Sequence, residues 1–334
     1  MNMYEKLLND ITLLGEKSGF GELIKRIIEG EIPTLRDVLD YLTGNLLTEF
    51  SGYSDMFVSV VAILLIAAFI GEISEKMRGV SELVASLLMA LTILKSNFFA
   101  GDYWMSGNGD ISVFVKAFVP IFAAVCVLSG NLTLSTVYGT AALLCMEIFS
   151  FINNTVLVPC INIVLSYGIV SGTAGSEKSG RLLTGFKKLL MYVMSGLAAL
   201  VLGLMSMNGF AAGGTDTLMY KTGKFLSGSA IPGIGSTVSS SFETAKACFD
   251  AAGSIIGVSG MLVITMIAAP YIIRAVVIVF AMSVLSILSD ILNMKKITFL
   301  FESIKTVCTL IISSYALELL VLVSGIALML VIGG

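Results

Sequence analysis

Three ionisable residues lie deep inside apolar runs of this sequence, at Glu147, Arg274 and Glu318. A charge at such a position costs at least about 2.5 kcal/mol on insertion scales, so it should face inward and find a partner. Counted from a turn near Lys296, Arg274 and Glu318 are both 22 residues away. We therefore predict an intramembrane Arg274–Glu318 pair, with Glu147 as the alternative partner. Such a pair could order a helix bundle or belong to a proton relay.

A second set of candidate residues lies in a polar stretch rich in Gly and Ser, residues 208–254. Backbone of this kind is tolerated at membrane depth only where protein or a water-filled cavity surrounds it. The charged residues could line an aqueous path, or they could be solvated loop charges. The candidate lining residues are Lys221, Lys224, Gly228, Pro232, Gly233, Gly235 and Glu243.

The sequence gives little support for catalysis, metal binding or phosphate binding. The chain has no histidine, which removes the commonest general base and metal ligand. Its five cysteines are scattered without metal-type spacing, and the Gly-rich stretch contains no phosphate-loop pattern. We expect no enzyme, no metal and no cofactor. The net charge is −3 without a basic block, so nucleic acid is not an expected partner.

Composition places the chain in a bilayer. Hydrophobic residues make up 56% and charged residues 13%, against about 25% charged in soluble domains. Mean hydropathy is +0.96. Residues 56–334 are expected to form one all-α integral membrane domain with about eight transmembrane helices, at roughly 20 residues each. The expected spans are 56–71, 83–94, 111–128, 134–152, 156–171, 189–207, 255–288 and 307–332, the seventh long and kinked at Pro270.

Residues 1–55 differ from the rest, with ten acidic and five basic residues and helical periodicity. We expect amphipathic helices that lie on the membrane or pack on a partner. A signal peptide is not expected, because Glu5, Lys6 and Asp10 interrupt any apolar core.

Charge in the loops predicts the topology. The basic loops 72–79, 173–188 and 293–305 fall on one face, the cytoplasmic one, if residues 208–254 form a re-entrant hairpin between eight spans. Treating that stretch as a single span would put the third basic loop on the wrong side. The charge pattern therefore favours the hairpin.

Proline spacing suggests an internal repeat. Pro120 and Pro232 are 112 residues apart, and Pro159 and Pro270 are 111 apart. A parallel repeat of 111–210 and 223–332 would follow, with one Gly/Pro-interrupted copy, as in many transporters. A chance match of prolines is the competing explanation.

The run Lys224-Phe-Leu-Ser-Gly-Ser-Ala-Ile-Pro-Gly-Ile-Gly235 is followed by a Ser-rich helix start and a long span. With the earlier run Gly30-Glu-Ile-Pro-Thr-Leu-Arg-Asp-Val-Leu-Asp40, it resembles the stage III sporulation protein AE family over nearly the whole chain. Members of that family generally begin with a signal peptide, and this sequence departs from them there.

The resemblance implies a multi-pass protein of the mother-cell membrane around the forespore, within the multi-protein apparatus that sustains forespore development. The expected role is its channel or export component, with other membrane proteins of that assembly as partners and a homo-oligomer as a further arrangement. The alternatives are an autonomous secondary transporter of a small solute, with its site at the broken hairpin 208–254, and a membrane scaffold.

Overall fold

The computed structural model describes residues 35–96, 103–128, 151–174, 184–196 and 235–333, with a few single helical positions between 136 and 203. For 235–254 it describes the helix path alone. All the regular structure in these residues is helical. The helices are α3 (Leu35–Gly52), α4 (Ser54–Ile73), α5 (Glu75–Leu94), α6 (Tyr103–Leu128), the π-turn η1 (Asn153–Leu157), α8 (Val158–Ala174), α10 (Gly235–Ile291) and α11 (Lys295–Gly333).

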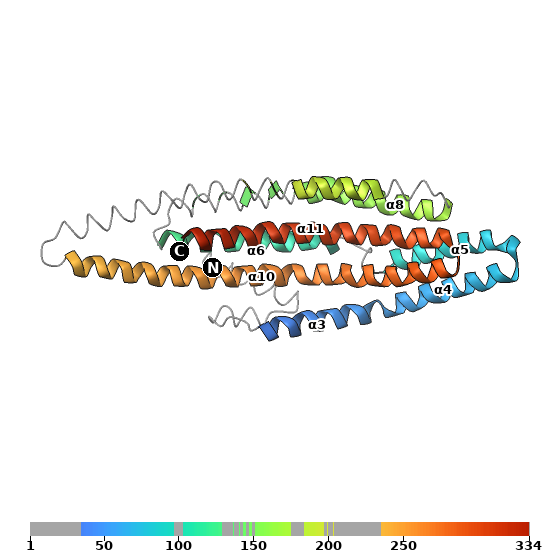
Figure 1. Cartoon of the computed structure of the whole chain (residues 1–334), viewed down its shortest axis with the longest axis horizontal. Helices are drawn as coiled ribbons and strands as arrows, with labels where there is room; N and C mark the ends of the chain where they lie inside the picture. The colour runs from blue at the N-terminus through green and yellow to red at the C-terminus, as the bar shows by residue number, and fades with distance from the viewer. Residues whose placement is uncertain are drawn as a thin grey trace, which may run out of the picture.

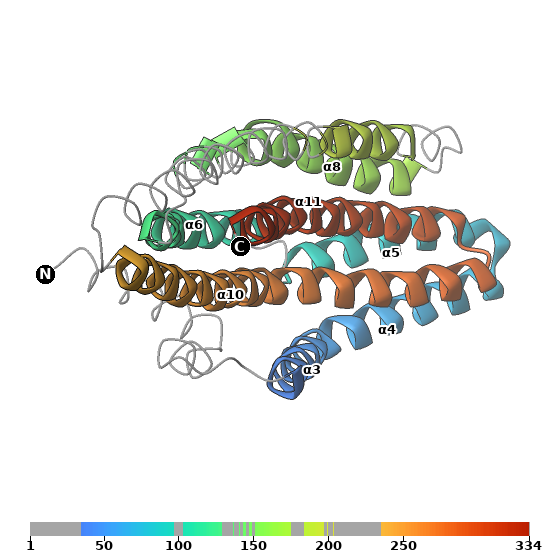
Figure 2. The same cartoon turned by 60° about the vertical axis from the view of Figure 1, so that its left-hand side comes forward.

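Two long antiparallel helices, α10 and α11, form the axis of the molecule (Figure 1). α8 packs on the side of α11 away from α10, and α3 packs on the opposite side, against α10 (Figure 2). α6 contacts the first half of α10, where Gly260 faces Phe118. α4 and α5 form a hairpin beside the other end of the axis. The buried apolar side chains of these helices form one connected core.

Five of the described helices are long and apolar enough to cross a membrane: Ser54–Ile73, Lys76–Leu94, Ser106–Leu128, Ile255–Ile291 and Lys295–Ala327. They confirm a chain of membrane type that is helical throughout the regular structure of its described residues. The predicted span 156–171 is a shorter apolar helix, Thr155–Ser171. The predicted spans 134–152 and 189–207 are only partly described, so a total of eight is not confirmed.

The two apolar stretches of the axis exceed the thickness of one bilayer. Ile255–Ile291 has 37 residues, which is about 55 Å of helix at 1.5 Å per residue. The hydrocarbon layer is about 30 Å thick, and tilts beyond about 40° are not observed. Even at that tilt the stretch spans about 42 Å, so its ends extend beyond the hydrocarbon layer into the interfacial regions or lie against protein.

The re-entrant hairpin is not supported by the described backbone. α10 begins at Gly235 and continues without a turn to Ile291. The hairpin needs the chain to reverse near residue 254, between its second arm and the following span, and no reversal occurs there. The repeat predicted from the proline spacing is likewise not visible. The first copy, 111–210, contains α6 and α8 as separate helices, whereas the corresponding part of the second copy, 223–332, is the single helix α10.

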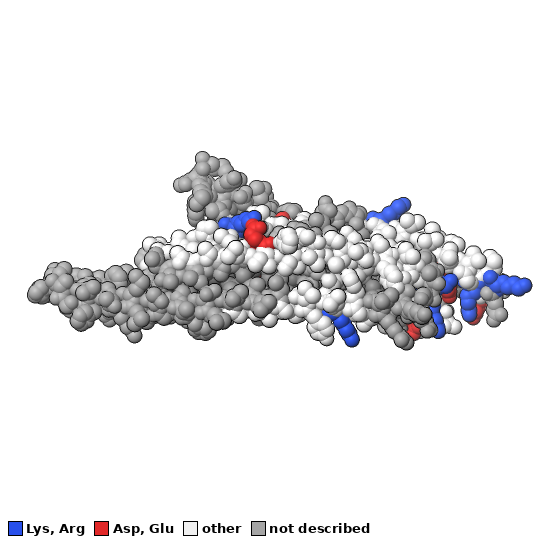
Figure 3. Space-filling view, turned by 90° about the horizontal axis from the view of Figure 1, so that it is seen from above, with Lys and Arg blue, Asp and Glu red and all other residues white. Residues whose placement is uncertain are grey.

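Charged side chains gather at one end of the molecule, while most of the described surface is uncharged (Figure 3). The α4–α5 turn and the α10–α11 turn lie together at that end (Figure 1). Lys76, Arg78, Lys295 and Lys296 belong to these turns, and Arg78 forms an ion pair of 3.2 Å with Glu72. The predicted basic loops 72–79 and 293–305 thus share one end.

Two glycines allow close helix packing. An ideal Cβ at Gly168 on α8 would lie 2.3 Å from the Ser303 Cβ on α11, and one at Gly260 would lie 2.2 Å from the Phe118 ring. We expect Gly168→Ala to lower the free energy of unfolding in detergent by about 1–2 kcal/mol, because overpacking outweighs the gain in helix propensity. The matched control is Gly44→Ala on α3, where a Cβ meets nothing within 4 Å. That variant should be neutral or slightly more stable, and equal losses in both variants would contradict the packing of α8 on α11.

Candidate functional site: polar side chains along the α10–α11 axis

An ion pair joins α3 to α10 in the middle of the bundle. The Arg274 Nε donates to Glu49 Oε2 at 2.8 Å, and its second terminal nitrogen donates to Glu49 Oε1 at 2.7 Å. The side chains are 18% and 14% exposed. Two parallel hydrogen bonds between a guanidinium and a carboxylate make a strong and oriented contact. Arg274 is therefore charged, paired and fixed in direction.

The same face of α3 satisfies a backbone group that Pro270 leaves open. Proline has no N–H, so in a helix the carbonyl four residues earlier loses its partner. That carbonyl belongs to Met266, and it accepts a hydrogen bond of 3.3 Å from the Tyr41 hydroxyl. Tyr41 and Glu49 are eight residues apart on α3, as are Met266 and Arg274 on α10, so the two helices run parallel here. α10 is continuous through Pro270, and Tyr41 of α3 supplies a donor to the Met266 carbonyl.

A recess of about 380 Å³ opens beside this ion pair. Its walls come from the end of α3, the start of α4, the end of α5 and α10, and its lining is about equally polar and apolar. Glu49, Lys95 and Arg274 place three charged groups on it. A recess of this kind within a membrane protein can hold water or a small polar solute.

A second buried polar group lies one turn before Arg274 on α10, where α6 meets the axis. The Tyr271 hydroxyl donates to Asp110 Oδ2 at 2.5 Å, and both residues are buried. The Tyr271 ring stacks on Tyr315 of α11 with 5.7 Å between centroids. Gly107 makes room for this stack, because a Cβ there would lie 2.3 Å from the Tyr315 hydroxyl oxygen. A buried hydrogen bond between α6 and α10 thus adjoins a ring stack between α10 and α11.

The contact between Tyr271 and Asp110 can be tested by removing one oxygen atom. We expect Tyr271→Phe to lower the free energy of unfolding by about 1–3 kcal/mol, because a buried carboxyl loses a hydrogen bond. Tyr192→Phe is the control, since the Tyr192 side chain is 74% exposed and its loss should change stability by less than about 0.5 kcal/mol. Chemical denaturation in detergent measures both. A Tyr271→Phe protein as stable as the control would show that the hydrogen bond contributes nothing.

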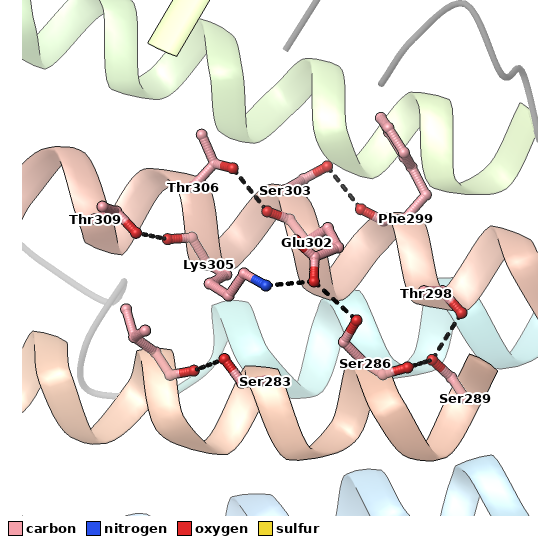
Figure 4. Close-up of polar contacts among 11 residues, drawn as sticks. Ser283, Ser286, Ser289, Thr298, Phe299, Glu302, Ser303, Lys305, Thr306 and Thr309 are labelled. Atoms are coloured by element: carbon pink, nitrogen blue, oxygen red, sulfur yellow. Dashed lines mark hydrogen bonds and ion pairs between the residues drawn. The ribbon is translucent and has the colours of Figure 1, made fainter. Parts of the chain in front are cut away.

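A third polar network ties the two axis helices near their turn (Figure 4). The Glu302 carboxylate accepts from the Lys305 ammonium and, at 2.9 Å, from the Ser286 hydroxyl of α10. Ser289 and Thr298 share a hydrogen bond of 2.9 Å between the same helices. These contacts fix the register of α11 against α10.

That register corrects the predicted pairing of Arg274 with Glu318. The structure places the turn at residues 292–294, with Asn293 at a φ of 57°, about three residues before Lys296. When the turn of a helical hairpin moves by three residues, the residue that faces a given position changes by six. Six residues correspond to about 9 Å along a helix. Arg274 pairs with Glu49 instead, and the Glu318 carboxylate oxygens have no hydrogen-bond partner. Glu147, the alternative partner, pairs with Lys116 of α6 at 3.2 Å.

The residues predicted for the hairpin site are not brought together in the described structure. Lys221, Lys224, Gly228, Pro232 and Gly233 lie outside the described residues. Gly235 and Glu243 belong to the first turns of α10, where only the helix path is described.

Sequence reasoning missed Glu49, Lys116, Asp110 and Tyr271. The position of Glu49 could have been noticed in the sequence, because this acidic residue lies between the apolar residues Leu47 and Phe50 near the end of an amphipathic helix. Lys116 also stands within an apolar span. Among the described residues no group of His, Cys, Asp and Glu has the arrangement of a metal site.

Comparison with known proteins settles the family. The model of the family described as Stage III sporulation protein AE matches residues 18–333. The chain belongs to this family. The Stage III sporulation protein AE of Bacillus subtilis (strain 168) is 24% identical over 193 residues, which are 57% of this chain and 48% of that protein. The match thus spans about half the length of that relative. No solved structure matches the chain.

Membership of the stage III sporulation protein AE family confirms the resemblance drawn from the runs at 30–40 and 224–235. The polar contacts described above therefore belong to a sporulation protein of membrane type. Their positions on α3, α6, α10 and α11 all lie inside the part of the chain that the family model covers.

Proposed function

We propose that this chain is the membrane-embedded channel or export component of the transport apparatus between mother cell and forespore, needed for forespore development. Membership of the stage III sporulation protein AE family and the five apolar helices support a sporulation role in a membrane. The observation that carries the proposal is the recess beside the Glu49–Arg274 pair. A protein that only anchors others needs apolar helices, whereas buried charge inside a membrane bundle is costly and marks solute or ion paths.

The orientation follows from the charged end of the molecule. Cytoplasmic loops carry an excess of Lys and Arg. We place the end with Lys76, Arg78, Lys295 and Lys296 in the mother-cell cytoplasm, and with it the predicted basic loop 173–188. The apolar surface of the axis that exceeds one bilayer would then be covered by other membrane proteins of the assembly or by further copies of this chain.

The proposal is tested by movement of a small fluorescent tracer from mother cell to forespore. In sporulating cells that lack this chain, we expect fluorescence recovery in the bleached forespore to be lost, and the wild-type gene to restore it. Arg274→Leu together with Glu49→Leu should leave the protein in the membrane but abolish recovery, because the recess loses two of its three charged groups. Arg36→Ala on the exposed face of α3 is the control and should restore recovery. Unchanged tracer movement in cells without the chain would overturn the proposal.

An autonomous secondary transporter is the second candidate, and buried Glu318 is the observation that favours it, since intramembrane carboxyls serve as relays in such proteins. Purified chain in liposomes separates the two candidates. A channel or export component should move no solute alone, while a transporter should accumulate one against a gradient without any partner protein.

A further inference from the structure

Glu318 is the most deeply buried ionisable carboxyl among the described side chains of the axis. Its residue exposure is 0%, and both carboxylate oxygens lack a hydrogen-bond partner. It lies within the apolar stretch Lys295–Ala327 of α11. An unpaired carboxylate at such a place is strongly unfavourable, and such groups become neutral instead.

The register of the axis shows what faces Glu318. Ser286 contacts Glu302, and Tyr271 stacks on Tyr315, so positions near 268–270 of α10 lie opposite Glu318. These are Ala268, Ala269 and Pro270, which offer no polar side chain. Tyr315 precedes Glu318 by three residues and thus lies on the same face of α11.

The charged groups on the neighbouring helices are engaged elsewhere. Arg274 of α10 holds Glu49, Lys116 of α6 pairs with Glu147, and Asp110 of α6 accepts from Tyr271. The ionisable side chains of α8 are Cys160 and Tyr167, neither of which is a cation at neutral pH. On α5, Lys76, Arg78 and Glu82 belong to the first turns beside the α4–α5 turn, and Lys95 lines the recess with Arg274. The described part of the chain therefore supplies no cation to Glu318.

We propose that Glu318 is a proton-binding site in the core of the bundle, occupied as a neutral carboxylic acid and loaded by one proton from water. The carboxylate gains that proton on one oxygen, and no other bond changes. The site stands apart from the Glu49–Arg274 recess and does not depend on the proposed channel role. Its ligand is the proton, and the carboxyl lies at the contact of α10 with α11 near Pro270.

Dicyclohexylcarbodiimide tests this directly, because it dissolves in membranes and reacts with protonated carboxyls. The acid proton goes to one nitrogen and the carboxyl oxygen bonds the central carbon, and the adduct rearranges to an N-acylurea of the same composition. We would treat the full chain in native membranes at neutral pH and map adducts by mass spectrometry. Glu318 should carry at least about tenfold more adduct than the ion-paired Glu49.

The outcomes separate the proposal from its rivals. Adduct at Glu318 that disappears in Glu318→Gln and does not depend on Na⁺ at constant ionic strength supports a proton site. Protection by Na⁺ but not by K⁺ would overturn it in favour of a metal-cation site. A Glu318 that reacts no faster than Glu49 in the folded protein would overturn it as well. Since the wild-type chain is labelled, no variant has to fold for the decisive comparison.

Discussion

Replacing Glu49 by alanine is expected to lower the free energy of unfolding by about 3–5 kcal/mol, because it leaves the Arg274 guanidinium partly buried without its carboxylate. The loss exceeds that of an ordinary surface pair because both side chains are mostly enclosed between α3 and α10. Unfolding of the purified chain in mixed micelles, followed by tryptophan fluorescence or helix content, measures it.

Two further variants make this prediction specific. Asp40→Ala on the same helix removes an ion pair of 3.9 Å whose side chains are 89% and 74% exposed, and it should cost less than about 1 kcal/mol. Replacing Glu49 and Arg274 together by leucine should recover most of the stability, because the pair then leaves no isolated charge. If Glu49→Ala were no worse than Asp40→Ala, the pair would have no structural role.

The second large effect is expected at Lys116 and Glu147. Lys116 is one residue from the centre of the apolar stretch Ser106–Leu128, and its pair with Glu147 is 57% and 65% exposed. Either single change to leucine leaves a lone charge at membrane depth, at a cost of about 2.5–3.5 kcal/mol on insertion scales. We expect both single variants to lose most of their membrane-inserted yield, measured by carbonate-resistant protein in isolated membranes.

A variant with both Lys116 and Glu147 replaced by leucine tests whether another protein covers this exposed pair. Lys116→Leu with Glu147→Leu should insert better than either single variant, since no charge remains. If the exposed pair contacts another protein of the assembly or a further copy, the double variant should nevertheless lose its larger complexes. Lys76→Leu, at the exposed end of α5, is the control and should change neither property. Single variants that insert as well as the control would contradict a membrane-depth position for the pair.

The sequence predicted the apolar helices well and their polar contacts poorly. Hydropathy located 56–71, 111–128 and 255–288 close to the observed helices, because apolar length reports the hydrocarbon layer. The start of α5 was predicted at 83 but lies at Glu75, since Lys76, Arg78 and Glu82 sit in its first two turns without ending the helix. Charge limits an apolar run, whereas a helix ends where its backbone turns.

The predicted pairing of Arg274 with Glu318 was wrong for a geometric reason. A helical hairpin doubles any error in the position of its turn, so three residues between Asn293 and Lys296 were enough to separate Arg274 from Glu318. Glu49 reaches Arg274 across 225 residues of sequence, and only the parallel packing of α3 on α10 brings them together. No periodicity within either helix contains that information. The hydrogen bond to the Met266 carbonyl shows the same limit, because its donor, Tyr41, comes from α3.

The most direct test of a channel or export role is the mass of the complex that contains this chain, measured in a mild detergent extract of sporulating-cell membranes. Native mass spectrometry of the tagged, full-length chain would give its copy number and its co-purifying proteins in one measurement. We expect a discrete complex that contains several copies of this chain or other membrane proteins of the sporulation assembly. A monomer free of partners, which transports a solute by itself once reconstituted in liposomes, would contradict it.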